Sequence, residues 1–139
     1  MRIMGGRGAR FHDVDSKGYE YGTKYHSFAQ VDDIKFIIGN KPDITDNPIE
    51  SMVAHRKYAV FTEKGVLKSI VFMDKHGARY KQIDFTHSHD GANPHTHLGY
   101  VHKENGTRLK LSRTEKSVYN KVKEFMANLT VDERKEIFK

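Results

Sequence analysis

Three strand-like segments follow one another between residues 57 and 89, and the short gaps between them constrain the fold more than any other feature. The first segment is KYAVFT, the second is VLKSIVFM, and the third begins at residue 78. Each gap is short and contains a glycine. Such gaps favour β-hairpins, because strands joined by a tight turn run antiparallel. The sequence therefore predicts an antiparallel meander, with a fourth strand over 94–102.

The hydrophobic pattern changes after residue 106. Apolar side chains then recur at i, i+4, i+7, i+8 and i+11, which is one face of an α-helix. These residues are Val118, Val122, Phe125, Met126 and Leu129. Ser112 with Glu115 has the spacing of a capping box, and Thr130 with Glu133 repeats it before a short last helix. We expect an α+β fold, an antiparallel β-sheet meander with C-terminal helices packed on one face.

The 139 residues suit one domain. Residues 1–24 are rich in glycine, charge and tyrosine without apolar periodicity, so we predict a basic, flexible arm there. Residues 25–139 form the predicted single α+β domain, in which the β-branched segment 34–38 is a further strand. The chain has no cysteine, which excludes disulfides and thiolate zinc sites.

The formal charge of +6, from 24 basic and 18 acidic side chains, fits either simple solubility or a polyanionic partner such as nucleic acid. No apolar run approaches the length of a membrane span, so no membrane partner is expected. The N-terminal segment lacks the apolar stretch of a signal peptide. Without a targeting signal in the sequence, a cytoplasmic location is the default expectation.

Two His-x-His pairs flank a short loop and are the strongest candidate for a functional site. The pairs are His87 with His89 and His95 with His97, separated by the five residues DGANP. Residues two apart in a strand point to the same side. In a hairpin centred on Ala92, His89 would face His95 and His87 would face His97, with Cβ atoms roughly 4.5–5.5 Å apart. The spacing predicts four imidazoles clustered on one face.

The parity of the flanking residues places this cluster next to the core. Ile83 and Phe85 share the parity of the first pair, and Val101 shares that of the second. The histidines would then continue an apolar stripe, where desolvation and mutual repulsion disfavour protonated imidazoles. Neutral imidazoles are needed both for metal binding and for general-base catalysis.

Three interpretations of the cluster compete. In the first, His87, His89, His95 and His97 bind a divalent metal, most plausibly zinc, with Asp84, Asp90 or His102 as further ligands or orienting groups. In the second, His95 and His97 are the acid and base of RNA cleavage, and a basic residue stabilises the phosphate. The candidates for that basic residue are Lys81, Arg108 and Lys110. In the third, the four are solvated loop histidines.

The remaining histidines and the aromatic residues of the predicted strands are expected to have no part in the functional site. His12, His26, His55 and His76 are isolated in sequence and are expected to be solvated. Aromatic residues alternate within the predicted strands, which favours core or sheet-surface positions over a nucleotide-stacking platform. These residues are Tyr58, Phe61, Phe72 and Tyr80.

Several segments together resemble a known group of phage proteins. They are GGRGARF, DDIKFIIGNK, ESM with KYAVFT, KSIVFMDKHGARYKQID and PHTHLGYVHKENG. The chain resembles, from about Gly5 to Phe125, small proteins or terminal domains encoded among the head genes of tailed bacteriophages and related prophages of Gram-positive bacteria. The most specific part is the histidine segment with the preceding KQID. Related minor head protein extensions are sometimes grouped with barnase/EndoU/colicin/RelE-like nucleases, which resembles the second interpretation.

We therefore expect a phage- or prophage-encoded virion or head-associated accessory protein, involved in head assembly or genome delivery. Its four-histidine site would bind metal, and its partners would be nucleic acid or phage structural proteins. The alternative is a histidine-dependent RNase of the barnase/EndoU/colicin/RelE-like type. His-x-His pairs also occur where several chains share one metal at a symmetry axis, so the sequence leaves the oligomeric state open.

Overall fold

The computed structural model describes residues 24–40, 47–48, 51, 53–85, 95–99, 107–108 and 110–138, with His95, Thr107 and Arg108 described by their backbone alone. The predicted arm at 1–24 therefore lies outside the described residues, apart from Lys24. So do His12, His87, His89, Asp90 and His102.

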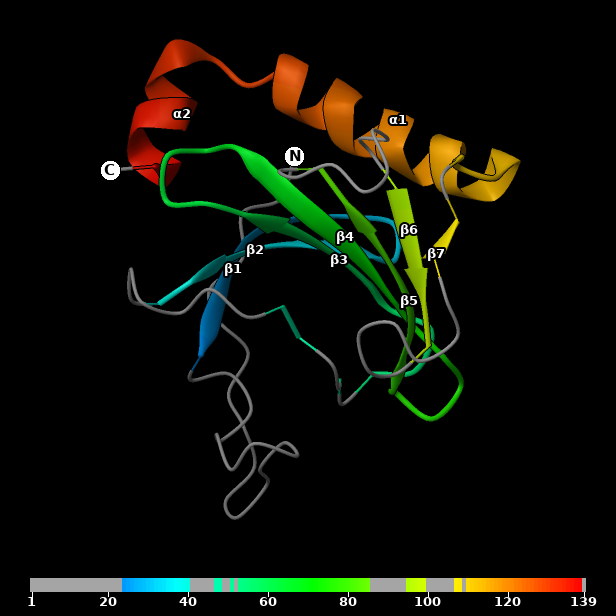
Figure 1. The fold of residues 1–139 in the computed structure, drawn as a ribbon. Helices are drawn as coiled ribbons and strands as arrows, with labels where there is room; N and C mark the ends of the chain where they lie inside the picture. The colour runs from blue at the N-terminus through cyan, green and yellow to red at the C-terminus, as the bar shows by residue number, and fades with distance from the viewer. Residues whose placement is uncertain are drawn as a thin grey trace.

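One twisted sheet contains the seven strands of the described residues, in the order in which they occur along the chain (Figure 1). The strands are β1 (Tyr25–Val31), β2 (Ile34–Gly39), β3 (Lys57–Phe61), β4 (Leu67–Met73), β5 (Arg79–Asp84), β6 (His95–Leu98) and β7 (Thr107–Arg108). Two helices follow, α1 (Arg113–Ala127) and α2 (Val131–Ile137). The predicted α+β architecture, a sheet followed by C-terminal helices, is confirmed.

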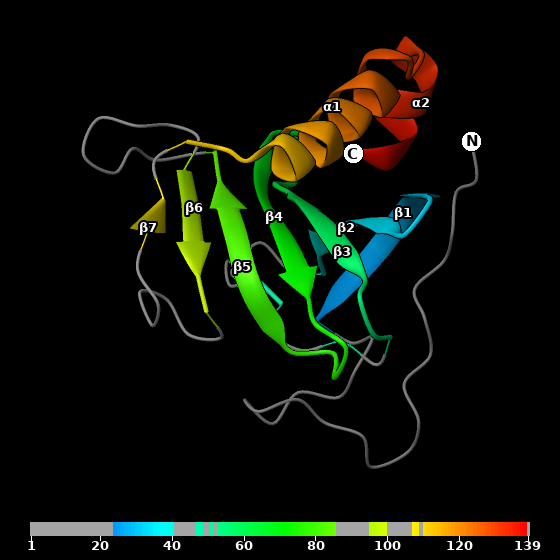
Figure 2. The same cartoon turned by 90° about the vertical axis from the view of Figure 1, so that its right-hand side faces the viewer.

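Antiparallel pairing runs from β3 through β7, which confirms the predicted meander. Figure 2 shows β5, β6 and β7 side by side at one end of the sheet. One pair differs: β2 lies parallel to β3, with Ile34 opposite Lys57 and Ile38 opposite Phe61. A parallel neighbour requires a crossover of about a dozen residues or more, and residues 40–56 provide it.

The turns between strands depend on particular backbone conformations. Asp32 and Asp33 form a two-residue turn between β1 and β2, and Asp32 takes a φ of 52°. Gly77, in the β4–β5 turn, has a φ of 77° and lies so close to the β2–β3 crossover that an added Cβ would be 2.2 Å from the backbone oxygen of Ser51. A glycine is therefore required here by both its dihedral and its neighbour.

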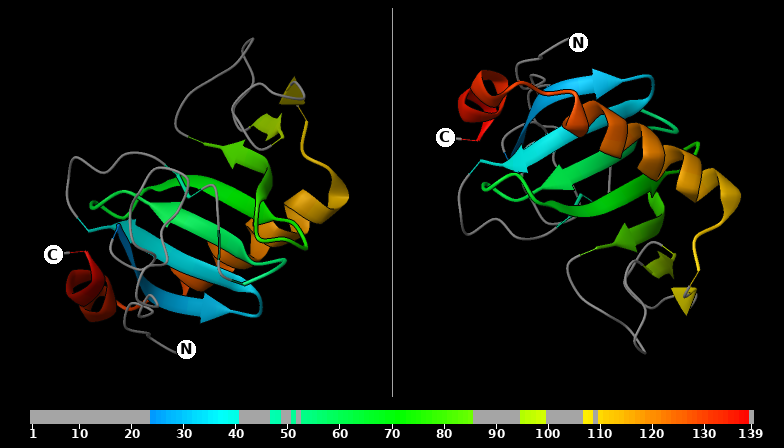
Figure 3. Two further views of the ribbon diagram at one scale, coloured as in Figure 1. Left: turned by 90° about the horizontal axis from the view of Figure 1, so that it is seen from below. Right: turned by 90° about the horizontal axis from the view of Figure 1, so that it is seen from above.

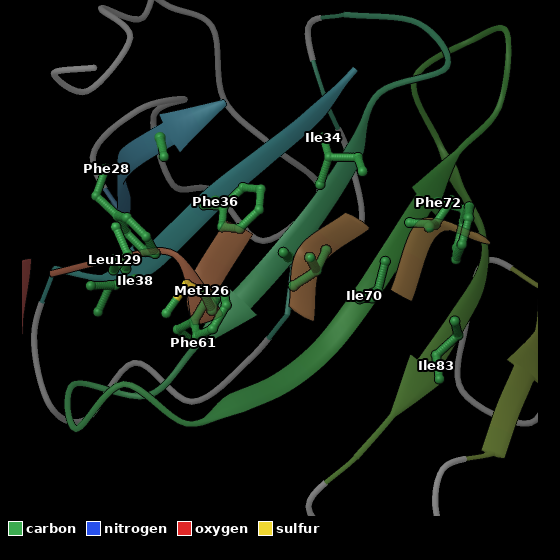
Figure 4. Close-up of a cluster of buried hydrophobic side chains, with 14 residues drawn as sticks. Phe28, Ile34, Phe36, Ile38, Phe61, Ile70, Phe72, Ile83, Met126 and Leu129 are labelled. Atoms are coloured by element: carbon green, nitrogen blue, oxygen red, sulfur yellow. The ribbon is translucent and has the colours of Figure 1, made fainter. Parts of the chain in front are cut away.

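Both helices cover the same face of the sheet, and α1 lies across several strands (Figure 3). Val118 and Val122 of α1, with Leu129 beyond it, are buried against the strands, and Phe125 packs on them, as the helical periodicity predicts. The strand side of this core supplies a layer of aromatic and aliphatic side chains (Figure 4). It includes Phe28, Ile34, Phe36, Ile38, Phe61, Ile70, Phe72 and Ile83.

The capping boxes form as expected at both helices. The side chain of Ser112 accepts a hydrogen bond from the backbone N–H of Glu115, whose carboxylate accepts one from the N–H of Ser112. Thr130 and Glu133 repeat the arrangement at α2. Two orphan N–H groups of each helix are thereby satisfied, which fixes where the helix begins.

The face of the sheet away from the helices has a smaller apolar cluster and a polar one. Ile37, Val60, Val71 and Met73 are buried together there. Next to them along the sheet, toward β6, the buried residues become polar: Ser69, Gln82, Asp84 and His97. The candidate site is this group of buried polar side chains, on the face of the sheet away from the helices.

Candidate functional site

The pairing of β5 with β6 decides where the histidines lie, and it differs from the prediction. His95 is opposite Asp84, and His97 is opposite Gln82. The predicted pairing of His97 with His87, and of His95 with His89, is therefore wrong. His87 and His89 lie outside the described residues, so the four-histidine cluster remains a prediction.

The observed register also reverses the predicted face. His97 is opposite Gln82, whereas the predicted hairpin placed it opposite His87. The observed register therefore differs from the predicted one by an odd number of residues. A shift of this kind moves every side chain of a strand to the other face of the sheet. Ile83 pairs with Thr96 on the helix-covered face, so His97 is on the opposite side from Ile83. The histidine does not continue the apolar stripe. It shares its face with Gln82 and Asp84 because register partners and alternate residues point the same way.

His97 forms a buried pair with Asp84. Its Nε2 lies 2.9 Å from Oδ2 of the carboxylate, and the two side chains are 4% and 5% exposed. Asp84 is a predicted ligand or orienting group for the histidines, and its carboxylate lies against the ring of His97. When the imidazole is neutral, Nε2 carries the proton that the carboxylate accepts, so Nδ1 carries the lone pair.

The second oxygen of Asp84 is also engaged. Oδ1 accepts hydrogen bonds from Oγ of Ser69 at 2.9 Å and from Nε2 of Gln82 at 2.7 Å. Nη1 of Arg79 donates to the amide oxygen of Gln82 at 2.8 Å, and the amide of Asn47 donates to Oγ of Ser69 at 3.1 Å. We call the side chains of Asn47, Ser69, Arg79, Gln82, Asp84 and His97 the Asp84 network.

Arg79 joins this network because of an irregularity in the ladder. Phe72 pairs with Lys81 but Met73 pairs with Arg79, so Tyr80 is an extra residue in β5. A bulge changes the side on which the preceding residues point. Arg79 therefore pairs with Met73 on the Asp84 side of the sheet, although its sequence parity would have placed it on the other.

Lys81, one of the predicted phosphate-binding residues, lies on the other side of the sheet from His97. Its Nζ is 3.1 Å from Oε2 of Glu115 and 4.6 Å from the centre of the Phe72 ring. Glu115 is fully buried, and its other oxygen is within hydrogen-bond distance of Thr96. The structure thus joins Lys81 to α1 and does not bring it to His97.

The other predicted site residues are placed less fully. Arg108 is in β7, where its backbone pairs with Thr96, and Lys110 is exposed just before α1. Within the described part of the chain, no three histidine or acidic side chains are grouped so as to hold a metal ion. The predicted zinc site also includes His87, His89, Asp90 and His102, which lie outside that part, so it stays a prediction.

The isolated histidines behave as expected where they are described. His26, His55 and His76 are exposed, and Nδ1 of His26 is 2.8 Å from the amide oxygen of Asn40. None of the helices in the described residues combines the length and apolar character needed to cross a membrane.

Sequence reasoning missed Ser69, Gln82, Arg79 and Asn47. A usable pattern was present in KQID, in which Gln82 and Asp84 flank the apolar Ile83. Successive side chains in a strand point to opposite faces of the sheet. Polar residues on both sides of a buried apolar one therefore indicate that the opposite face is polar. Their burial could not be predicted, because it depends on the strands on either side.

An Asp–His pair of this kind has two chemical uses. The carboxylate fixes the tautomer and the orientation of the ring, which prepares Nδ1 either to take up a proton or to bind a metal ion. Both uses need the imidazole held in one geometry, and the hydrogen bonds of Ser69 and Gln82 to Asp84 provide that constraint. Arg79 and Asn47 in turn donate to Gln82 and Ser69. Comparison of the chain with protein-family models, with curated proteins and with solved structures found no match.

Proposed function

We propose that this chain is a histidine-dependent, RNA-cleaving nuclease encoded by a phage or prophage, with His97 as a proton-transferring group and Asp84 as its positioning residue. The observation that carries the proposal is the buried Asp84–His97 pair, with 2.9 Å between Nε2 and Oδ2. A histidine oriented in this way is the commonest general base in enzymes. The phage setting and a location in the host cytoplasm or the virion rest on the sequence resemblance.

The proposed reaction uses the ribose 2′-hydroxyl of the substrate as the nucleophile. Nδ1 of His97 takes the proton of that hydroxyl while its oxygen bonds to the adjacent phosphorus. The bond from phosphorus to the 5′-oxygen of the next nucleotide breaks, and that oxygen receives a proton from an acid. His95, two residues from His97 in β6, is the candidate acid. The products are a 2′,3′-cyclic phosphate and a free 5′-hydroxyl.

The phosphate needs a positive partner in this reaction, because charge accumulates on its oxygens. Lys81 is engaged with Glu115 on the other face of the sheet. Arg79 is the basic side chain hydrogen-bonded to the Asp84 network among the residues described. Arg79 is therefore the proposed phosphate-stabilising residue in place of Lys81, and Arg108 is a further candidate.

A second candidate function is a metal-binding accessory protein of the phage head, in contact with nucleic acid or other virion proteins. The observation that favours it is the same carboxylate contact, because metal-ligating histidines commonly bind a carboxylate through their other nitrogen. His97 would bind zinc through Nδ1, with His87, His89 and His95 as the other ligands of the sequence hypothesis. A metal bound only by the folded state would stabilise it by mass action.

An RNA cleavage assay combined with melting curves separates the two candidates. A nuclease should cleave RNA in the presence of chelator, leave a 2′,3′-cyclic phosphate, and lose this activity in His97→Gln but not in the matched surface variant His76→Gln. A metal site should lose melting temperature in chelator and regain it with zinc. Absence of cleavage by the folded wild-type protein would overturn the nuclease proposal, and melting curves insensitive to chelator and zinc would overturn the metal one.

A further inference from the structure

We propose that the solvent-facing side of α1 holds the phosphate backbone of RNA, as a surface separate from the Asp84 network. The residues are Lys110, Arg113, Lys116 and Lys123, and we call them the α1 basic face. All four are exposed. The inference rests on the proposed function only for the choice of RNA as the polyanion.

Helix geometry brings three of the four members of the α1 basic face together, and Lys110 lies just before the helix. Arg113, Lys116 and Lys123 are three and ten residues apart, which places them along one side of a helix with 3.6 residues per turn. The rise of 1.5 Å per residue spreads them over about 15 Å. A nucleic-acid strand in a duplex has a phosphate about every 3.4 Å along the axis, so this face spans several phosphates rather than one small anion.

In the part of the chain that the structure describes, no ion pair neutralises the charge of this face. Within the described residues, Lys110, Arg113 and Lys116 are in no ion pair, whereas Lys121 on the flank of the helix pairs with Asp32 at 3.1 Å. Of the two acidic residues of α1, Glu115 is buried and paired with Lys81, which leaves Glu124 as the exposed one. The exposed side of α1 is therefore strongly positive.

The position of the basic residues also opposes what helix stability favours. Arg113 is the first residue of α1, Lys116 follows one turn on, and the last turn has no basic residue. The helix dipole favours acidic side chains at the N-terminus and basic ones at the C-terminus. The helix dipole therefore does not account for the positions of Arg113 and Lys116, which fit a surface that binds a polyanion.

A membrane fits this face less well than RNA. Helices that lie on membranes insert an apolar side, but the apolar side of α1 is buried on the sheet. The exposed large hydrophobic residues of the described chain are Val66, Tyr80 and Val131, and none of them is in α1.

The N-terminal end of α1 lies next to β6. Glu115 of α1 contacts Thr96 of β6, so the α1 basic face begins beside the strand that carries His97.

The test compares two triple variants that remove the same charge. Lys110→Gln/Arg113→Gln/Lys116→Gln alters the α1 basic face, and Lys64→Gln/Lys75→Gln/Lys135→Gln alters three exposed lysines elsewhere. The probe is single-stranded 2′-O-methyl RNA, which lacks the nucleophilic hydroxyl and so cannot be cleaved by the proposed route. We expect the first variant to bind at least about tenfold more weakly than the control and to reduce the salt slope by about 2.

Equal affinities of the two variants would overturn the inference, as would absence of RNA binding by the wild-type protein. Binding of anionic phospholipid vesicles that depends on the α1 basic face, without RNA binding, would replace RNA by a membrane. The outcomes for the proposed function are separate. If the protein binds the probe through the α1 basic face but cleaves no RNA, the inference stands and the nuclease proposal fails. If the protein cleaves RNA but the two variants bind the probe equally, the nuclease proposal stands and the inference fails.

Discussion

Nε2 of His97 lies 2.9 Å from Oδ2 of Asp84, although the two residues are on neighbouring strands whose predicted pairing would have placed them apart. The contact exists because His95 is opposite Asp84 in the ladder, which brings His97 diagonally next to the carboxylate on the same face. Ser69 and Gln82 hold the other oxygen of Asp84. The carboxylate of Asp84 is therefore held in place on one side by Ser69 and Gln82, and on the other side it orients the imidazole of His97.

His97 should be held in a single tautomer when its ring is neutral. Because Asp84 accepts from Nε2, the neutral ring should carry its proton on Nε2 and not on Nδ1. Nitrogen-15 NMR of the ring distinguishes the tautomers directly. Asp84→Ala removes the acceptor and should abolish the preference, whereas the exposed His76 should give the same spectrum in both proteins. A wild-type spectrum with the proton on Nδ1 would contradict the described contact.

Lys81 and Glu115 should matter for stability rather than for chemistry. Glu115 is fully buried and the Lys81 side chain is 14% exposed, so removing one partner leaves an uncompensated charge. We expect Lys81→Met to lower the free energy of unfolding by about 3 kcal/mol. In a double-mutant cycle with Glu115→Gln, denaturant unfolding should show strong coupling between the two sites. Loss of RNA cleavage in Lys81→Met without loss of stability would return Lys81 to the catalytic group.

The two turn glycines offer a matched comparison. Gly65 and Gly77 both have positive φ, at 86° and 77°. An alanine Cβ at Gly65 would meet the ring of Phe138 at 3.1 Å, whereas at Gly77 it would meet the backbone oxygen of Ser51 at 2.2 Å. Both substitutions should destabilise, Gly77→Ala by about 2 kcal/mol or more because the crossover backbone must also move. Equal costs in thermal unfolding would show that Ser51 does not pack on this turn.

Asp74 should contribute a pH-dependent part of the stability. The backbone N–H groups of Ala78 and His76 donate to its carboxylate and hold the pKa of Asp74 below its ordinary value of 3.8. A lowered folded-state pKa means that the contribution is present above the unfolded value and is lost as the pH falls through the folded one. The stability difference between wild type and Asp74→Asn should therefore shrink in acid. Glu63→Gln, an exposed carboxylate of the β3–β4 turn, serves as the control.

Local patterns were enough to predict the meander, the α1 helix and both capping boxes. Short glycine-containing gaps determine which strands pair, and the spacing of Val118, Val122 and Leu129 determines which side of the helix is buried. These features depend on residues that are close in sequence, so one sequence is enough to predict them. They were sufficient for the fold class.

The register of β5 with β6 could not be predicted in the same way. The mirrored His-x-His pairs suggested a hairpin centred on Ala92, but the ladder pairs Asp84 with His95. Burial of Ile83 against the helices and of Asp84 among polar partners determines this register. That information comes from β4 and α1, which are not local in the sequence.

β1 was missed for a related reason. The ladder shifts between Ser27 and Ala29, so Phe28 and Ala29 are both buried in the same core. A bulge breaks the alternation by which a strand is recognised. The same kind of irregularity at Tyr80 placed Arg79 in the Asp84 network.

The most direct test of the proposed site is the rate of RNA cleavage by Asp84→Asn in chelator, measured beside wild type, His97→Gln and His76→Gln. Asparagine preserves the shape of the side chain but removes the charge that orients and stabilises His97. We predict a rate lower by about a hundredfold or more for Asp84→Asn and His97→Gln, with both proteins folded and His76→Gln unaffected. Wild-type cleavage rates in folded Asp84→Asn and His97→Gln would contradict the account.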